Sequence, residues 1–231
     1  MNVRNRVACA ALVAAVAAGC GGGGYDDGVP ASDSYDVAAA WRNLLGADAD
    51  FTLAGVGSDN DNYTLALALR RATAAAYPLT GEVGARGIQT TTLLRNAVSL
   101  GTTTTTRFHD AGGRLIGTSS AAGECATVTA QAALPAAAAV GSSGVLFDAT
   151  RYDSCQPGGA MALGTLLADW SLEVENGVVL FCVTSEQRDA LDNRVAVESD
   201  CIAVDRNGAL GPYARTSIAV PGGLTLVARN Y

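Results

Sequence analysis

The stretch VVLFCVTSEQRDALDNRVAVESDCIAV, residues 178–204, contains two runs rich in β-branched and apolar residues, separated by a polar loop. Runs of this kind, bounded by turn-forming residues, are typical of β-strands. We therefore expect strands over 178–185 and 194–204, joined by residues 186–193 as an antiparallel hairpin. In that pairing Cys182 and Cys201 can lie opposite each other, which favours a disulfide between them.

Strand signals continue on both sides of this hairpin. Turn formers separate the runs, and Asn176-Gly177 and Asn207-Gly208 are among the strongest short-range hairpin signals. The expected strands cover 51–57, 63–70, 88–95, 98–108, a short segment after the turn at 110–113, 125–130, 145–150, 163–174, 210–220 and 224–228. About eleven strands with hairpin turns throughout predict an all-β fold, an antiparallel meander that closes into a barrel. A two-sheet sandwich is the alternative.

One short amphipathic helix is expected at the N-terminal end of the domain. Asp33 or Ser34 can cap its start, and Gly46 can end it. Its apolar stripe should lie against the sheet and close one side of the core. The residues of that stripe, at helical spacing, are Val37, Trp41, Leu44 and Leu45.

The cysteines indicate two disulfides. The chain has 6 cysteines, of which Cys9 and Cys20 belong to the N-terminal segment. The other four allow three connectivities, and the strand pattern that favours Cys182–Cys201 leaves Cys125–Cys155. No C-x-x-C pair occurs and His109 is the single histidine, so we expect no metal site.

The N-terminus has the pattern of an export signal. Residues 1–6 carry Arg4 and Arg6, and residues 7–18 are all Val, Ala, Leu or Cys. A basic start followed by a short apolar core is typical of a secretory signal peptide. The apolar run is shorter than the roughly 20 residues that a spanning helix needs.

The end of this segment, Ala17-Ala18-Gly19-Cys20, resembles the lipobox of bacterial lipoproteins, although that family usually has Leu where this chain has Ala17. The resemblance implies that residues 1–19 are removed and that Cys20 carries fatty acyl chains such as palmitate. Gly21 follows the cysteine in place of the aspartate that favours inner-membrane retention in that family. The resemblance therefore implies a bacterial envelope protein held at the outer membrane by its lipid. The alternative is an ordinary secretory signal cut near Ala18.

Three segments follow from these patterns. Residues 1–19 form the signal peptide, residues 20–34 are a glycine-rich acidic tether, and residues 35–231 form a single β-rich domain. The alanine-rich stretch 131–140 is the place where two related halves would join. Residues 102–117 and 197–211 share an order of strand, Asp-x-x-Gly turn, Leu and Gly, which a common hairpin pattern explains as well as duplication does.

Charge and residue content exclude several functions. After removal of Arg4 and Arg6, 13 arginines remain against 22 acidic residues, a net charge of about −9. A nucleic-acid partner is therefore not expected. The chain contains no lysine, which rules out lysine Schiff-base chemistry and the G-x-x-x-x-G-K phosphate loop. We expect no cofactor.

No catalytic group of residues is visible, so we do not expect an enzyme. The G-S-S-G at 141–144 lacks the spacing of a nucleophile elbow, and His109 is expected in a solvated turn. The run Asp59-Asn60-Asp61-Asn62 lacks the further ligands of a calcium loop and predicts a hairpin turn.

Three functional hypotheses remain. The first is a membrane-anchored envelope lipoprotein with a noncatalytic binding or structural role, whose partner is an envelope protein or the cell wall. The second is a carrier of a small apolar ligand inside a barrel. The third is a hydrolase that uses carboxylates alone.

Overall fold

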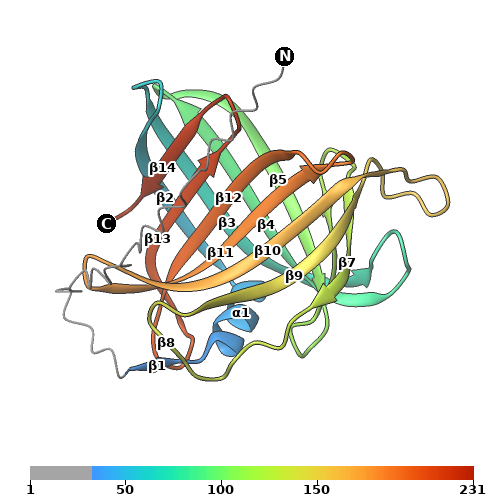
Figure 1. Ribbon diagram of the computed structural model, residues 1–231, viewed down its shortest axis with the longest axis horizontal. Coiled ribbons are helices and arrows are strands. Elements are labelled where there is room, and N and C mark those ends of the chain that lie inside the picture. Colours follow the sequence, from blue (N-terminus) through green and yellow to red (C-terminus); the bar gives the residue numbers. More distant parts are fainter. Residues whose placement is uncertain (1–32) are drawn as a thin grey trace, which may run out of the picture.

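A computed structural model describes residues 33–231, and Cys20 and the segment before it lie outside the described residues. Twelve antiparallel strands form one closed barrel (Figure 1). Each strand pairs with the next along the ring, so the predicted meander and its closure into a barrel are confirmed. The strands are β2 (Ala49–Gly57), β3 (Asn62–Ala76), β4 (Val83–Arg95), β5 (Val98–His109), β6 (Leu115–Ser120), β7 (Cys125–Gln131), β9 (Ser143–Tyr152), β10 (Ala162–Glu175), β11 (Val178–Asp189), β12 (Arg194–Val204), β13 (Leu210–Ala219) and β14 (Thr225–Arg229).

The barrel closes where β14 pairs with β2. Only four residue pairs make this junction, Leu226–Arg229 against Ala54–Gly57. A Cβ on Gly55 would lie 2.1 Å from the carbonyl oxygen of Val227, so the two strands approach too closely there for any larger residue. Closure places alternate residues of every strand inside, as the buried, alternating residues Leu65, Leu67 and Leu69 of β3 show.

Helix α1 (Val37–Leu45) closes one end of the barrel, together with the small sheet of β1 (Ser34–Tyr35) and β8 (Ala138–Ala139) (Figure 1). The expected caps Asp33 and Ser34 are wrong. Asp36 caps the helix instead, and its Oδ1 accepts a hydrogen bond of 2.7 Å from the backbone N–H of Ala39. The chain enters the helix later than expected because Ser34 is held in β1.

The apolar face of α1 points into the barrel. Val37, Ala40, Trp41 and Leu45 are buried. The indole N–H of Trp41 donates a hydrogen bond of 2.8 Å to the carbonyl of Gly113, which ties the helix to the turn before β6. Gly46 ends the helix, as expected, but at a φ of −103° it does not use the left-handed conformation that favours glycine.

Residues 131–140 lie at the same end. Ala138 and Ala139 form β8, and the carbonyl of Pro135 accepts a hydrogen bond of 3.1 Å from the N–H of Ala38 in α1. The sheet continues without a break on either side of this stretch, from β7 to β9.

Several strands are longer than the sequence predicts. Strand β3 runs six residues beyond the expected end at Arg70, and β4 begins at Val83. The extension carries the β3–β4 connection over the outer wall, where Tyr77 packs in a cluster with Phe108, Ile116 and Cys125. The Tyr77 hydroxyl donates to the carbonyl of Ala126 at 2.8 Å, so packing, rather than strand propensity, holds this extension.

Both expected disulfides are present. Cys182 and Cys201 are direct neighbours in the pairing of β11 with β12, as the hairpin predicted. The bond Cys125–Cys155 joins β7 to the loop between β9 and β10.

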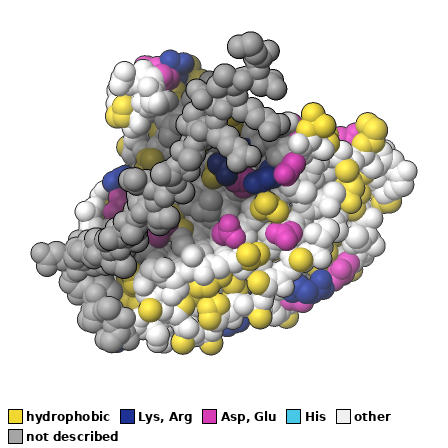
Figure 2. All heavy atoms as spheres, viewed as in Figure 1, with side chains coloured by type: hydrophobic (Ala, Val, Ile, Leu, Met, Phe, Trp, Pro, Cys, Tyr) yellow, Lys and Arg dark blue, Asp and Glu magenta, His cyan; other side chains and the backbone are white. Residues whose placement is uncertain are grey.

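The outer wall carries charged side chains among exposed apolar ones such as Val56, Val145 and Val227. On the face shown in Figure 2, arginine and acidic side chains lie beside each other in several places. Ion pairs of this kind occur along the barrel, for example between Arg70 and Asp50 at 2.6 Å. Exposed pairs contribute only about 0–1 kcal/mol each, so they keep the exterior hydrated more than they hold the fold.

We predict that Gly87→Ala destabilises the protein through α1. Gly87 is in β4, and a Cβ there would lie 2.3 Å from the carbonyl oxygen of Leu45, at the end of the helix. Overpacking of this kind costs about 1–3 kcal/mol, which should lower the melting temperature measured by circular dichroism. The matched control is Gly159→Ala, since a Cβ at Gly159 meets no atom within 4 Å. Equal melting temperatures for the two variants would show that α1 does not seat tightly on β4.

Candidate functional site

The barrel encloses a cavity of about 140 Å³ above helix α1. Eight strands and the helix contribute to its walls, so it lies in the lumen. The apolar lining residues are Trp41, Leu44, Leu67, Leu69, Phe147, Leu166, Val183 and Ile202. The polar lining residues are Gln89, Thr105, Arg107, Thr118, Ser185, Gln187, Glu198 and Asp200.

Strand register brings the charged residues into the lumen. Glu198 and Asp200 are two residues apart on β12, so both side chains point to the same face of the sheet. Thr105 and Arg107 are likewise two apart on β5, and Gln89 of β4 is the direct partner of Thr105. Strands β5 and β12 stand on opposite sides of the ring. The lumen therefore has a cation on one wall and two carboxyl groups on the other.

A chain of hydrogen bonds crosses the lumen. Arg107 Nη2 donates to Gln89 Oε1 at 2.6 Å, and Gln89 Nε2 donates to Asp200 Oδ2 at 3.0 Å. Thr216 Oγ1, from β13, donates to the other oxygen of Asp200 at 2.7 Å. Both oxygens of Asp200 are thus satisfied by neutral side chains, and the two walls approach each other here.

Glu198 and Arg107 are left largely without partners. Among residues 33–231, Glu198 forms neither a hydrogen bond nor an ion pair, and Arg107 bonds only Gln89. No fully buried side-chain nitrogen or oxygen of these residues lacks a hydrogen-bond partner. The free atoms of both groups therefore face the cavity that they line.

The pKa of Glu198 is raised to about 8. The main cause is the negative charge of Asp200, followed by burial, while Arg107 acts in the opposite direction. Burial lowers the pKa of Arg107, and the two carboxyl groups partly offset this. Arg107 remains charged, since its ordinary value is far above neutrality. The negative charge of Asp200 and burial thus favour a proton on Glu198, and Arg107 is the one basic residue among those that line this cavity.

The lumen continues toward the end opposite α1. A second cavity of about 140 Å³ shares Thr105, Thr118, Leu166 and Gln187 with the first and extends to Ser120 and Glu124. Its wall includes Arg151, which pairs with Glu124 at 3.4 Å. The two cavities are therefore neighbours in the lumen, with these four residues between them.

A larger cleft of about 520 Å³ lies at the closed end, between α1 and the splayed ends of β6 and β7. Half of its lining residues come from the segment 128–134, in which Ala130, Ala132 and Ala133 have small side chains. Its charged residues are Arg42 and Arg114, and Arg114 is already paired with Glu82 and Asp110. Among the described residues, the cleft thus has no buried charged side chain without an ion-pair partner.

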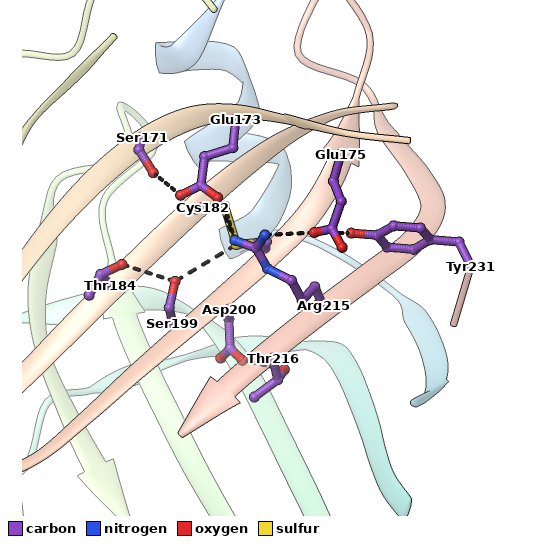
Figure 3. The surroundings of a disulfide bond; sticks show 11 residues. Ser171, Glu173, Glu175, Cys182, Thr184, Ser199, Asp200, Arg215, Thr216 and Tyr231 are labelled. Carbon is purple, nitrogen blue, oxygen red and sulfur yellow. Dashed lines mark hydrogen bonds and ion pairs between the residues drawn. A yellow bond between two sulfur atoms is a disulfide. The ribbon is translucent and has the colours of Figure 1, made fainter. Parts of the chain in front are cut away.

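The disulfide Cys182–Cys201 sits on the outer side of the wall (Figure 3). Arg215 covers it, with Nη2 3.1 Å from the sulfur of Cys201, and pairs with Glu173 and Glu175. Glu173 lies near both sulfur atoms, but these are bonded to each other and are not free to bind a metal. This cluster stabilises β12 from the outer side, next to Asp200.

The other residues singled out by sequence are engaged in turns. Asp59 and Asp61 both pair with Arg95 beside the β2–β3 hairpin. His109 Nδ1 lies 2.9 Å from the carbonyl oxygen of Asp110. Neither group reaches the lumen cavity.

The lumen cluster was missed by the sequence analysis. No candidate was named at Gln89, Arg107, Glu198 or Asp200. A signal exists in retrospect, because Glu198 and Asp200 alternate with Val197, Ser199 and Cys201 in a strand, so one face of that strand is acidic. Which face points inward depends on the register of the whole ring, which one strand cannot show.

Comparison with known protein families, with curated proteins and with solved structures finds no match to this chain. Among residues 33–231, no helix is both long enough and apolar enough to cross a bilayer.

We predict that Glu198→Gln changes how stability depends on pH. The pKa of Glu198 in the folded protein, about 8, lies above its ordinary value of 4.5, so between these values the folded state holds a proton that the unfolded chain releases. Stability of the wild type should then fall as pH rises through this window. Glutamine cannot ionise, so the variant should gain at least about 1 kcal/mol on the wild type between about pH 5 and about pH 8.

Urea unfolding at both pH values measures this difference. The control is Asp169→Asn, an exposed acid on β10. Parallel pH profiles for wild type and Glu198→Gln would show that Glu198 is ionised in the folded protein.

Proposed function

We propose that this protein is a lipid-anchored envelope protein whose barrel lumen binds a small molecule. The observation that carries the proposal is the lumen cavity into which Arg107 and Glu198 both project without pairing to each other. A charge that is buried without a partner typically costs several kcal/mol. Such groups cluster at functional sites more often than elsewhere.

The lining of the cavity favours a polar ligand over a wholly apolar one. An apolar molecule would strip water from Arg107 and Glu198 and offer no hydrogen bond in return. Trp41, Phe147 and Leu166 provide an apolar side, so a small molecule with both polar groups and a short hydrocarbon part fits best. A cavity of about 150 Å³ holds a molecule the size of benzene, which sets the scale of the ligand.

Anchoring at Cys20 completes the proposal. Two or three acyl chains at that cysteine would hold the protein at a membrane, since each buried methylene contributes about 0.8 kcal/mol. Because Ser34 belongs to β1, the residues between Cys20 and that strand would then separate the barrel from the lipid surface, in the outer membrane of a bacterial envelope. The two disulfides support an oxidising compartment such as that envelope.

We predict that Thr105→Phe abolishes lumen binding. Thr105 lines both lumen cavities, so a phenyl ring there should fill the space between them. The measurement is native mass spectrometry of the protein isolated from its own membrane in mild detergent, where wild type should carry a small-molecule adduct. The control is Thr102→Phe, because Thr102 is exposed and bonds Thr92 on the outer wall.

Two results would contradict lumen binding. One is an adduct of equal abundance on Thr105→Phe, which would place the molecule elsewhere. The other is a wild type without any adduct whose melting temperature is unchanged by a panel of small acids, amines and amino acids.

For the anchor, we predict that Cys20→Ser releases the protein from the membrane fraction. Serine cannot form the thioether that carries the lipid, so the variant should lose the acyl mass and appear in the soluble fraction. Intact mass and fractionation of wild type and variant measure both effects, with Cys9→Ser as the control in the signal peptide. A wild-type protein whose mass shows no acyl chains would rule out the anchor while leaving lumen binding untouched.

A further inference from the structure

We propose that the lumen ligand is a small zwitterion, with its anionic group on Arg107 and its cationic group on Glu198. This inference rests on the proposed lumen-binding function and names the ligand class of that site. It follows from three properties of the cavity: the hydrogen-bond donors left on Arg107, the acceptor left on Glu198, and the lack of an ion pair between these two residues.

The Arg107 side of the cavity suits a carboxylate or a similar anion. One nitrogen, Nη2, is engaged with Gln89 Oε1. The rest of the guanidinium makes no hydrogen bond or ion pair with residues 33–231 and faces the cavity. A guanidinium presents its remaining N–H groups in a planar fork that matches the two oxygens of a carboxylate.

The Glu198 side suits an ammonium group. Asp200 already accepts hydrogen bonds from Gln89 and Thr216, whereas Glu198 accepts none from the described residues. The direct register neighbours of Glu198, Ser185 on β11 and Ile218 on β13, carry no charge that could neutralise it. An ammonium group supplies three donors and the opposite charge.

Arg107 and Glu198 do not satisfy each other. No ion pair of 4.0 Å or less forms between them, although they line one cavity from opposite walls. A ligand with a single charged group would offer a partner to one wall and leave the polar atoms of the other wall without one. A molecule with an ammonium group at one end and a carboxylate at the other offers a partner to both Glu198 and Arg107, and the apolar lining of Trp41 and Phe147 can accommodate the hydrocarbon between them.

Binding of a zwitterion should release a proton from the protein. The charged groups that face Glu198 are Asp200 on its own strand and Arg107 across the lumen. Asp200 and burial raise its pKa to about 8, although Arg107 acts in the opposite direction. The ligand's ammonium favours the ionised carboxylate, so affinity should rise with pH up to about 8 and then level off.

The test is isothermal titration calorimetry on the full chain in detergent, with glycine, β-alanine and γ-aminobutyrate as zwitterions of increasing length. Propionate and propylamine carry the two charged groups singly. One of the zwitterions should bind at least about tenfold more tightly than either single-charge compound. Its apparent affinity should increase between about pH 6 and about pH 8, with proton release seen as a dependence of the heat on buffer.

Two variants test the contacts of the two ligand ends separately. Glu198→Gln should abolish the pH dependence and weaken the zwitterion to the level of propionate, and Arg107→Gln should weaken it to the level of propylamine. The controls are Asp169→Asn on the outer face of β10 and Arg42→Gln on α1, both exposed. Circular dichroism verifies that each variant is folded, and Thr105→Phe should prevent binding of all probes.

The outcomes separate this inference from the proposed function. If propionate or propylamine binds as tightly as every zwitterion, in a manner that Thr105→Phe blocks, the zwitterion assignment is wrong and lumen binding stands. The same holds if the native adduct is lost in Thr105→Phe but none of the three zwitterions binds. If no probe binds and no native adduct is found, both the function and the ligand class are overturned.

Discussion

Closure of the sheet is the constraint on which the rest of the structure depends. β14 meets β2 over four residue pairs, and Gly55 allows that contact because a side chain would strike the backbone of Val227. Once the ring is closed, side chains alternate between the lumen and the exterior, so every second residue of each strand lies inside. The positions of Arg107, Glu198 and Asp200 in the lumen are therefore consequences of strand register, and no loop is needed to form the site.

The hydrophobic side chains do not fill the whole interior of this twelve-stranded barrel. Apolar residues of β2 and β3 fill one side of the lumen, where Leu53 and Leu65 are fully buried. Above α1, between β4, β5 and β12, the filling is polar, and Gln89 bridges the two walls between Arg107 and Asp200. The fold thus combines a stable apolar side with a charged chamber whose groups are fixed by strands. Rigid placement of this kind lowers the entropy lost when a ligand binds.

The sequence predicted what local patterns determine. Asn-Gly turns and β-branched runs located the hairpins, and the pairing of 178–185 with 194–204 was enough to place Cys182 opposite Cys201. Prediction failed where contacts between distant parts of the chain determine the local structure. The N-cap is Asp36 because pairing with β8 holds Ser34 in a strand. Strand β3 extends beyond its predicted end because Tyr77 packs on the outer wall. The lumen cluster is the clearest case. Gln89 and Asp200 are 111 residues apart, and their hydrogen bond exists only after the ring has closed.

The sequential order of the strands also shapes how the chain reaches this structure. Eleven of the twelve barrel junctions join strands that follow one another around the meander, and only the β14–β2 junction connects the ends of the domain. Local hairpins lose little chain entropy when they form, whereas the last junction must close a loop that contains nearly the whole domain. Folding should therefore proceed as growth of an open, curling sheet that becomes a barrel in its final step. Until that step the charged residues of the future lumen remain in water, so their desolvation is postponed to the moment of closure.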